Sequence, residues 1–380
     1  MSIYLDYNAS NPVDHRVLDA MITAYKGYYG NPDSRTHDFG MNAHSTVEKA
    51  RAQVAVLLDV KTDEVIFTSG ATESNNIAIL GLREYGIAHN RKHIVTTAIE
   101  HKAVLEPIKI LESNGFEVDY VAPNSNGRIE VETLRNRIRE DTLLVSVMHV
   151  NNETGIIQPV VELGEALSRT KTYFHIDAAQ SCGKLRDQLM DAKYDLLSIS
   201  AHKMYGPQGI GALIMRKRRY KMPPISPIFF GGQQERGFRP GTIPVALTVG
   251  LGTACDIAKA EYQANMNHYA EIKDQILNLL EQSKVPYQIN GAPEYCLPNT
   301  INISFIGIDS EALMLASKQY CGVSNGSACT SSDYSHSHVL AAMGLGEERI
   351  ESAIRISWGI HTKDIQEFKY FLESAKKLLQ

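Results

Sequence analysis

The sequence predicts an α/β fold built on a largely parallel sheet, and three observations support this prediction. Short apolar runs alternate with amphipathic helical patterns between residues 64 and 215. Polar residues follow several of these runs, and ligands of open α/β sheets bind outside the strand ends. The length of 380 residues, with 43% hydrophobic and 21% charged residues, is typical of a globular protein with one large or two medium domains.

Composition narrows the class of protein. The formal net charge of −5 offers no basic excess for direct nucleic-acid binding. Five cysteines without paired spacing favour free thiols in a reducing compartment. The first residues lack the basic and apolar regions of a signal peptide, and no apolar run approaches the roughly 18 residues of a membrane span. We therefore expect a cytoplasmic protein without membrane contact.

The elements follow in order along the chain. Residues 1–12 predict a short strand and a polar segment, and helix 13–29 begins near Asp14. The polar loop 30–37 is either plain surface or the wall of a site, and helix 39–58 is amphipathic. Strands are then expected at 64–68, 93–97, 116–121, 142–149, 172–176, 194–200 and 211–215. The helices between them are expected to end near residue 88 and to span 102–114, 130–139 and 160–170.

A second domain follows the sheet. Residues 222–244 are rich in proline and glycine and predict a long loop with a functional or interface role. A helical pattern then runs from Ile243 to about Ser283, with a break, and leads into mixed strands and helices. We expect a large α/β domain at 13–255 and a small α+β domain formed by 1–12 and 256–380.

The clearest candidates for catalytic residues follow two neighbouring predicted strands. Asp177 follows one buried strand and Lys203 follows the next, where a carboxylate and a lysine are costly to place. Most lysines are simply solvated, but partial burial depresses a lysine's pKa and lets it form a Schiff base. An aspartate can hold the protonated pyridine nitrogen of pyridoxal phosphate. With Ser200 and His202 beside Lys203, this pair predicts a pyridoxal phosphate enzyme.

Three further strand ends carry weaker signals. The small residues at 69–74 suit an anion at a helix N-terminus, although ordinary capping by Ser69 or Thr72 explains that run better by itself. His101 is suited to stacking on a cofactor ring or moving protons, or is a helix-start histidine in water. Asn152 is suited to bonding a ring substituent, or is a turn asparagine.

The C-terminal third adds a thiol and a guanidinium. Cys329 lies among glycine, serine, alanine and threonine residues, which suits an exposed nucleophilic thiol more than a buried cysteine. A zinc site with His336 and His338 is a minor alternative, because it offers one thiolate and no further ligand pair, and we predict no metal. Arg355 alternates with apolar residues in a strand and needs a carboxylate partner from the protein or a substrate.

Taken together, these segments resemble the NifS/IscS-type cysteine desulfurases of the class V aminotransferase family, which are fold-type I pyridoxal phosphate enzymes. The resemblance runs nearly end to end and is carried by motifs at 4–9, 31–37, 69–74, 100–101, 149–155, 175–180, 200–203, 231–242, 326–330 and 355–357. It implies a large domain with a mostly parallel seven-stranded sheet, and a smaller α+β domain that carries a mobile Cys329 loop. It also implies pyridoxal 5'-phosphate as cofactor, L-cysteine as substrate and a homodimer.

The resemblance also implies roles for individual residues. The catalytic residues are Cys329, Lys203 and His101. The cofactor is bound by Lys203, Asp177, Gln180, His101, Ala71, Thr72, Asn152, Ser200, His202 and, from the other subunit, Thr242. The substrate carboxylate is bound by Asn152 and Arg355. In the implied reaction L-cysteine becomes L-alanine, and its sulfur forms a persulfide on Cys329 that passes to an acceptor protein.

Some positions depart from the family pattern. Residues 8–11 read Asn-Ala-Ser-Asn, residues 324–325 read Ser-Asn in place of Ser-Ser, and the chain stops at Gln380, before the usual C-terminal extension. These departures favour an acceptor in DNA phosphorothioation, with iron–sulfur cluster assembly or tRNA thiolation as alternatives. The rival functions are a selenocysteine lyase or aminotransferase on the same fold, and a non-catalytic partner-binding protein. No position favours the non-catalytic rival, because every chemical position is filled.

Overall fold

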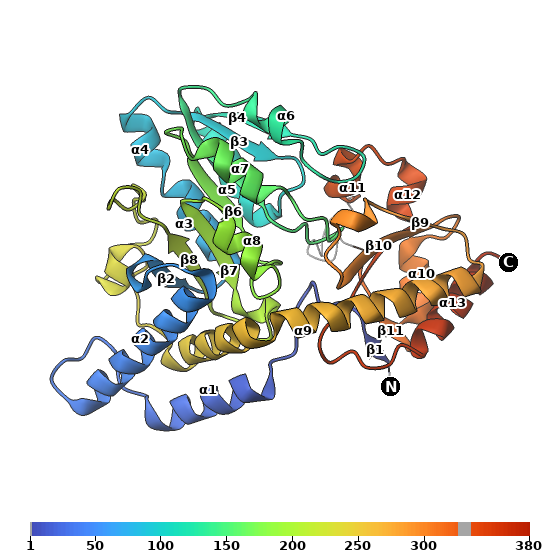
Figure 1. Cartoon of the computed structure of the whole chain (residues 1–380), viewed down its shortest axis with the longest axis horizontal. Coiled ribbons are helices and arrows are strands. Elements are labelled where there is room, and N and C mark those ends of the chain that lie inside the picture. Colours follow the sequence, from blue (N-terminus) through green and yellow to red (C-terminus); the bar gives the residue numbers. More distant parts are fainter. Residues whose placement is uncertain (1, 326–335) are drawn as a thin grey trace.

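The computed structural model describes residues 2–325 and 336–380, and a seven-stranded sheet forms the centre of its larger part (Figure 1). The strand order is β2-β8-β7-β6-β5-β3-β4, and the pairing is parallel except that β8 runs antiparallel to both neighbours. The mostly parallel α/β sheet predicted from the sequence is therefore confirmed. The strands are β2 (Val65–Thr68), β3 (His93–Thr97), β4 (Glu117–Val121), β5 (Thr142–Met148), β6 (Tyr173–Asp177), β7 (Leu196–Ser200) and β8 (Gly211–Met215).

Both faces of this sheet are apolar because it is covered by helices on both sides. Neighbouring residues of one strand therefore enter different cores: in β5, Leu144 belongs to one hydrophobic cluster and Val145 to the other. The helices on the side of Leu144 are α3 (Ala71–Leu80), α4 (Arg83–Ala88) and α5 (Lys102–Ser113). The cluster of Val145 takes in α2 (Asp38–Leu58), α7 (Val160–Leu167), α8 (Arg186–Asp191) and part of α6 (Val131–Arg135).

Three helix predictions need correction. The helix expected to reach residue 88 is divided into α3 and α4, because the Gly81 carbonyl accepts a hydrogen bond from the Ser226 N–H between them. The helix expected at 130–139 ends at Arg135 and continues only as turns. The break expected between Ile243 and Ser283 is absent, since α9 (Val245–Ser283) is one helix of 39 residues. Its Gly252 allows close packing, because a Cβ there would lie 2.8 Å from the Ala50 Cα of α2.

Helix α9 runs from the large sheet to the smaller one, as the long yellow and orange helix of Figure 1 shows. Its first half packs against α1 (His15–Gly27) and α2. Its second half places Tyr269, Ile272 and Ile276 in a separate hydrophobic cluster around the small sheet. At about 1.5 Å per residue, a helix of this length spans nearly 60 Å.

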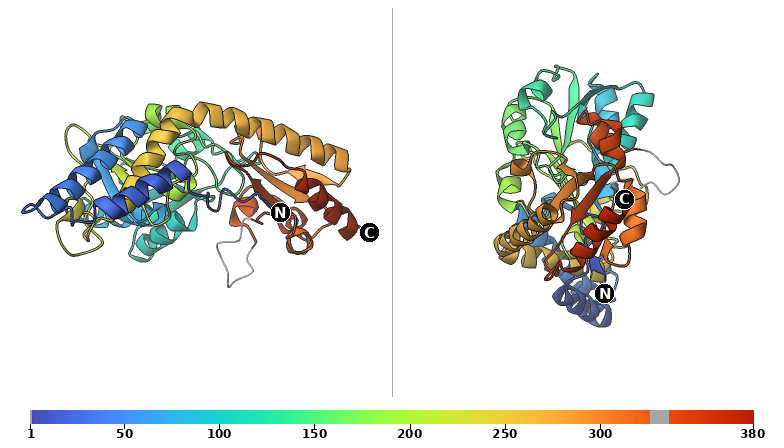
Figure 2. Two further views of the ribbon diagram at one scale, coloured as in Figure 1. Left: turned by 90° about the horizontal axis from the view of Figure 1, so that it is seen from below. Right: turned by 90° about the vertical axis from the view of Figure 1, so that its right-hand side faces the viewer.

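The smaller part is an antiparallel sheet of order β12-β10-β9 with helices beside it. Its elements are β9 (Tyr287–Ile289), β10 (Thr300–Phe305), α10 (Ser310–Ser317), β11 (Cys321–Gly322), α11 (His338–Ala342), α12 (Glu347–Glu351), β12 (Ala353–Ser357) and α13 (Glu367–Leu378). The N-terminal strand β1 (Ile3–Tyr4) pairs in parallel with β11, and Asp6 bridges to Ser357. Figure 2 shows both chain ends on this side of the molecule.

No helix in the described ranges is both long enough and apolar enough to cross a membrane. The division into domains at 13–255 and 256–380 stays a prediction.

Candidate active site

A cavity of about 450 Å³ lies at the carboxyl ends of the large sheet's strands and reaches the small sheet. Among the described residues, every predicted cofactor- or substrate-binding residue except Thr242 lines it: Ala71, Thr72, His101, Asn152, Asp177, Gln180, Ser200, His202, Lys203 and Arg355. All but Arg355 meet there because the parallel strands of the large sheet end at one edge, whereas Arg355 comes from the small sheet. Thr242 is exposed in the loop before α9 and does not line this cavity.

Lys203 stands in the 3-10 turn η2 (Ala201–Lys203), directly after β7. Its Nζ donates to the main-chain carbonyls of Asn8 and Ala9, the latter at 2.7 Å. The buried Lys184 lies close behind, and its Nζ donates to the Lys203 carbonyl at 3.2 Å and to the Gln180 carbonyl at 3.0 Å. The N-terminal segment thus holds the Lys203 amine, and Lys184 links the Lys203 main chain to the turn that follows β6.

Asp177 is the last residue of β6 and is nearly buried. Its carboxylate accepts from Asn75 Nδ2 at 2.8 Å and from the Ala179 N–H at 2.9 Å. These two N–H donors fix the orientation of the carboxylate at the end of the strand. The Oδ1 of Asn75 is buried and has no hydrogen-bond partner within the described chain, although Asn75 lines the cavity.

Two histidines in the cavity are held neutral. The Nδ1 of His101 accepts from the Ala103 N–H at 3.0 Å, so that its ring proton resides on Nε2. Burial lowers the pKa of His101, and nearby Lys203 lowers it further, against the opposing effect of Asp177. Burial, with the charges of Lys203 and Lys184, lowers the pKa of His202 to about 4.

The opposite end of the cavity suits an anion. Helix α3 begins there at Ala71, and no side chain caps it, so capping by Ser69 or Thr72 does not account for this run. Its N-cap residue Gly70 has φ +154°, and a Cβ there would lie 3.6 Å from Ser200 Oγ. Exposed N–H groups and a helix dipole favour a phosphate at this point. Glu73, the acidic residue nearby, is compensated by Arg239 at 2.8 Å.

These features fit pyridoxal phosphate. The uncapped helix suits its phosphate, Asp177 suits its ring nitrogen, and Lys203 suits its aldehyde carbon. The unpartnered Asn75 Oδ1 inside the cavity is an additional sign that a polar ligand belongs there.

Arg355 forms the small-sheet wall of the cavity. It lies in the middle of β12, its Nη1 donates to the Asn152 carbonyl at 3.0 Å, and its Nη2 donates to Asp6 Oδ1 at 2.6 Å. The carboxylate partner that the strand position predicted is therefore present within the protein.

Sequence reasoning missed several residues of this site. Asn75, Lys184 and the carbonyls of Asn8 and Ala9 contact the predicted residues directly. One signal was available for Asn75, because it follows Thr72 by three positions and therefore shares a helix face with it. Nothing local distinguishes Lys184 from a solvated lysine.

Cys329 lies outside the described residues, but one flank of its segment contacts Arg355 and the other contacts residues adjacent in sequence to Asn152 and His101. The Ser324 N–H donates to the Arg355 carbonyl at 3.2 Å, and the Arg355 N–H donates back at 2.6 Å. On the other side, Ser337 Oγ donates to the buried Glu153, and His338 Nε2 lies 3.0 Å from the Glu100 carbonyl.

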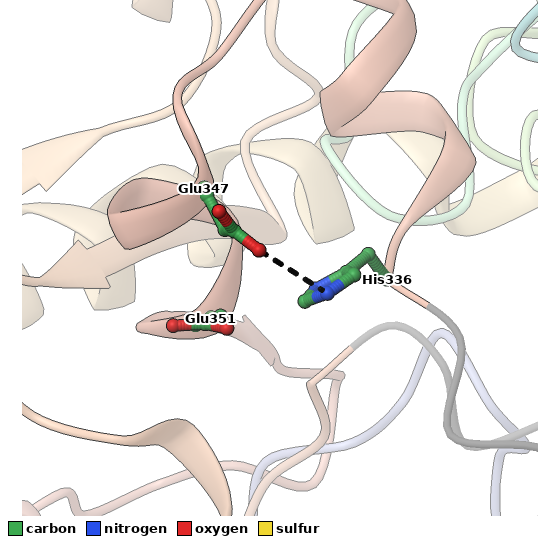
Figure 3. A group of neighbouring side chains, drawn as sticks. All are labelled: His336, Glu347 and Glu351. Atoms are coloured by element: carbon green, nitrogen blue, oxygen red, sulfur yellow. Dashed lines mark ion pairs between the residues drawn. The ribbon is translucent and has the colours of Figure 1, made fainter.

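The two histidines of the alternative zinc site contact different residues. His338 faces Glu100, whereas His336 lies near Glu347 and Glu351. The ligand atoms of this exposed group lie within 4.8 Å of one another, and His336 Nε2 is 4.0 Å from Glu347 Oε1 (Figure 3). Exposed acidic groups commonly gather in this way without a metal ion.

Comparisons with known proteins agree with the geometry. Residues 3–368 match the family model described as aminotransferase class-V. The chain is 45% identical over 375 residues to cysteine desulfurase IscS of Neisseria meningitidis, covering 98% of this chain and 91% of that protein. It is 43% identical to a human cysteine desulfurase, covering 98% of this chain and 80% of that one.

Solved structures are similar as well. A NifS-like protein superimposes with a TM-score of 0.90 at 38% identity, covering 100% of this chain and 99% of that chain. DndA from Streptomyces lividans superimposes with a TM-score of 0.82 at 45% identity, covering 94% of this chain and 99% of that chain.

Proposed function

Because the chain belongs to the class V aminotransferase family and is a cysteine desulfurase that depends on pyridoxal phosphate, we propose that the cavity around Lys203 is its active site. The observation that carries this proposal is the placement of Lys203, Asp177 and Arg355 around one cavity of about 450 Å³. An amine, a carboxylate and a guanidinium are the groups needed to hold a pyridoxal cofactor and an amino acid together.

In the proposed site, Lys203 would hold the cofactor covalently and Asp177 would hold its ring nitrogen. His101 would stack on the ring, Gln180 and Asn152 would contact its oxygen substituent, and Ala71, Thr72, Ser200 and His202 would hold the phosphate. When bound, pyridoxal phosphate supplies an electron sink for charge that develops on the substrate carbon. The uncapped N-terminus of α3 and the lowered pKa values of His101 and His202 support this assignment.

The chain's own groups perform the remaining steps of the proposal. Arg355 and Asn152 hold the substrate carboxylate, and Lys203 Nζ accepts the α-proton. The Cys329 thiolate attacks the sulfur of L-cysteine, so that an S–S bond forms and the C–S bond breaks. The electron pair of that bond passes to the β-carbon, which takes up the proton released by the substrate thiol through His101 Nε2, and Lys203 Nζ returns its proton to the α-carbon to give L-alanine.

Chain length supports the proposed role of Cys329. It follows Ser324 by only five positions in the chain, and the main chain of Ser324 is hydrogen-bonded to Arg355.

We further propose a homodimer in which Thr242 reaches the cofactor of the other subunit. In support, Thr242 is exposed and does not line the cavity of its own chain. The outer face of α1 also exposes Leu18 at 48%, Ile22 at 42% and Tyr25 at 62%. An apolar helix face of this kind is a common feature of protein interfaces.

For the sulfur acceptor, we propose a protein of a DNA phosphorothioation pathway, on the basis of the sequence departures at 8–11 and 324–325. Iron–sulfur cluster assembly and tRNA thiolation are the alternatives. We also propose a cytoplasmic location, which suits the free cysteines Cys182, Cys255, Cys296 and Cys321. Pull-down of acceptor proteins with persulfide-loaded enzyme separates the pathways.

Two variants test the catalytic assignment. Cys329→Ser should keep the visible absorbance of the bound cofactor and lose desulfurase activity by about a hundredfold or more. Lys203→Ala should lose both the Schiff-base absorbance and the activity. Alanine and sulfide production, measured beside the absorbance spectrum, checks both results. Full turnover by Cys329→Ser would overturn the persulfide role and leave a selenocysteine-lyase type of reaction.

A further inference from the structure

Asp6 is a charged residue that pairs with Arg355 of the cavity lining and that the proposed reaction does not use. Its Oδ1 accepts from Arg355 Nη2 at 2.6 Å, and the two side chains are 19% and 6% exposed. The pairing is set by the main chain, because Asp6 bridges to Ser357 alongside β12. The Ser357 N–H donates to the Leu5 carbonyl at 2.8 Å, which holds the N-terminal segment beside Arg355.

The guanidinium of Arg355 is therefore only partly engaged. Nη2 meets Asp6 and Nη1 meets the Asn152 carbonyl, while Nε is buried with no hydrogen-bond partner in the part of the chain that the structure describes. A buried N–H of this kind is where an acceptor from a ligand belongs. The positive charge of Arg355 is already compensated by the carboxylate of Asp6. A ligand carboxylate that binds to Arg355 is therefore attracted less strongly.

We propose that Asp6 sets the affinity of the active site for α-carboxylates, by competing with the carboxylate of substrate and product for the guanidinium of Arg355. This inference rests on the proposed role of Arg355 in substrate binding. The negative charge of Asp6 also repels the carboxylate of the bound amino acid. This repulsion is the same for L-cysteine and L-alanine, since both carry an α-carboxylate. Asp6 therefore weakens product binding together with substrate binding, which favours release of L-alanine after each turnover.

The test measures binding in the Cys329→Ala background, where sulfur transfer cannot occur. L-alanine and L-alanine methyl ester are titrated into the cofactor-loaded enzyme, and the change in cofactor absorbance gives each Kd. Asp6→Asn keeps an oxygen that accepts from Arg355 but removes the negative charge. It should lower the Kd of L-alanine about tenfold and change that of the ester less than twofold.

The matched control is Asp274→Asn, which removes the same charge from an exposed position on α9 and should leave both Kd values unchanged. If Asp6→Asn does not fold, Asp6→Ser, which is also uncharged and polar, replaces it. An unchanged or higher Kd for L-alanine, or equal gains for the acid and its ester, would overturn the inference.

Arg355→Gln separates this inference from the proposed function on which it rests. The variant should raise the Kd of L-alanine and spare the ester. If it affects neither, the role of Arg355 fails; if it behaves as expected while Asp6→Asn does not, only the role of Asp6 fails.

Discussion

Glu100 is a carboxyl group that the folded chain removes from water. Its Oε1 accepts from Thr97 Oγ1 at 2.6 Å and from the Met148 N–H at 2.9 Å, whereas its buried Oε2 has no partner among the residues described. Burial raises the pKa of Glu100 to about 8, and the charge of Asp177 contributes to the rise. At neutral pH, Glu100 is therefore protonated, and so it adds no negative charge beside His101, which lines the cavity.

This pKa predicts how stability depends on pH. Since the folded pKa of Glu100 lies near 8 and the ordinary value is 4.5, the folded state binds more protons between these two pH values. Protonated Glu100 therefore contributes its full share of stability below pH 4.5, and this contribution is lost as the pH rises through the folded pKa of about 8. Its slope is at most about 1.4 kcal/mol per pH unit.

Glu100→Gln removes this titration while keeping the shape of the side chain. The free energy of unfolding of the variant, relative to the wild type, should therefore rise steadily between about pH 5 and pH 8. Urea unfolding of both proteins at several pH values measures this difference in free energy. Glu84→Gln is the control, because Glu84 is exposed to solvent. A pH-independent difference would show that Glu100 is ionised in the folded protein.

At the scale of elements, the loop before α9 is held by a buried ion pair. Arg51 of α2 donates through both Nη atoms to Glu235, at 2.7 and 2.8 Å, and Glu235 also accepts from the Phe67 N–H at 2.7 Å. Glu235 and Arg236 have φ values of 47° and 59°, a conformation that non-glycine residues adopt only when surrounding contacts enforce it. The pair thus links the loop that carries Thr242 to the strand that leads to Gly70.

Glu235→Gln should lower the free energy of unfolding by about 3 kcal/mol, because it leaves Arg51 buried without its main counter-charge. The control is Glu48→Gln, which also contacts Arg51, at 2.9 Å, but whose side chain is 44% exposed. That variant should cost less than about 1 kcal/mol. Chemical denaturation compares the two, and equal costs would contradict the view that burial makes the Glu235 pair strong.

At the scale of the whole molecule, α9 connects the core around the large sheet with the core around the small one. The cavity lies between these parts, since Asp177 and Lys203 come from the large sheet and Arg355 from the small one. The N-terminal segment joins them a second time, because Asn8 contacts Lys203, Gln180 and Thr300. Contacts between the two parts therefore fix the position of Arg355 relative to Asp177 and Lys203.

The proposed dimer makes a prediction about mixed assemblies. Lys203→Ala and Thr242→Val chains, co-expressed with different tags and purified as mixed dimers, should regain about half of the wild-type activity at limiting cofactor. If Thr242 serves the opposite subunit, each site takes Lys203 from one chain and Thr242 from the other. One site of the mixed dimer then carries both substitutions, and the other site carries neither. Activity no higher than that of the Thr242→Val dimer alone would show that Thr242 acts within its own chain.

The sequence by itself determined the local features of this protein. The period of its apolar residues marked the strands of the large sheet to within about two residues, and the residues that follow these strands identified a part of the cavity lining. Both are properties of short stretches, in which backbone preference and burial pattern act together. The continuous α9 was mispredicted because the packing of Gly252 against α2 outweighs the low helix propensity of glycine.

Only the tertiary structure decided which distant residues meet. Asp6 reaches Arg355 across 349 positions, Lys203 reaches the Asn8 carbonyl across 195, and Asn75 reaches Asp177 across 102. These contacts set charge, orientation and protonation in the cavity, yet each joins two elements that no local pattern pairs. The reason is physical: periodicity specifies which face of an element is buried, whereas the neighbour on that face follows from the packing of the whole chain.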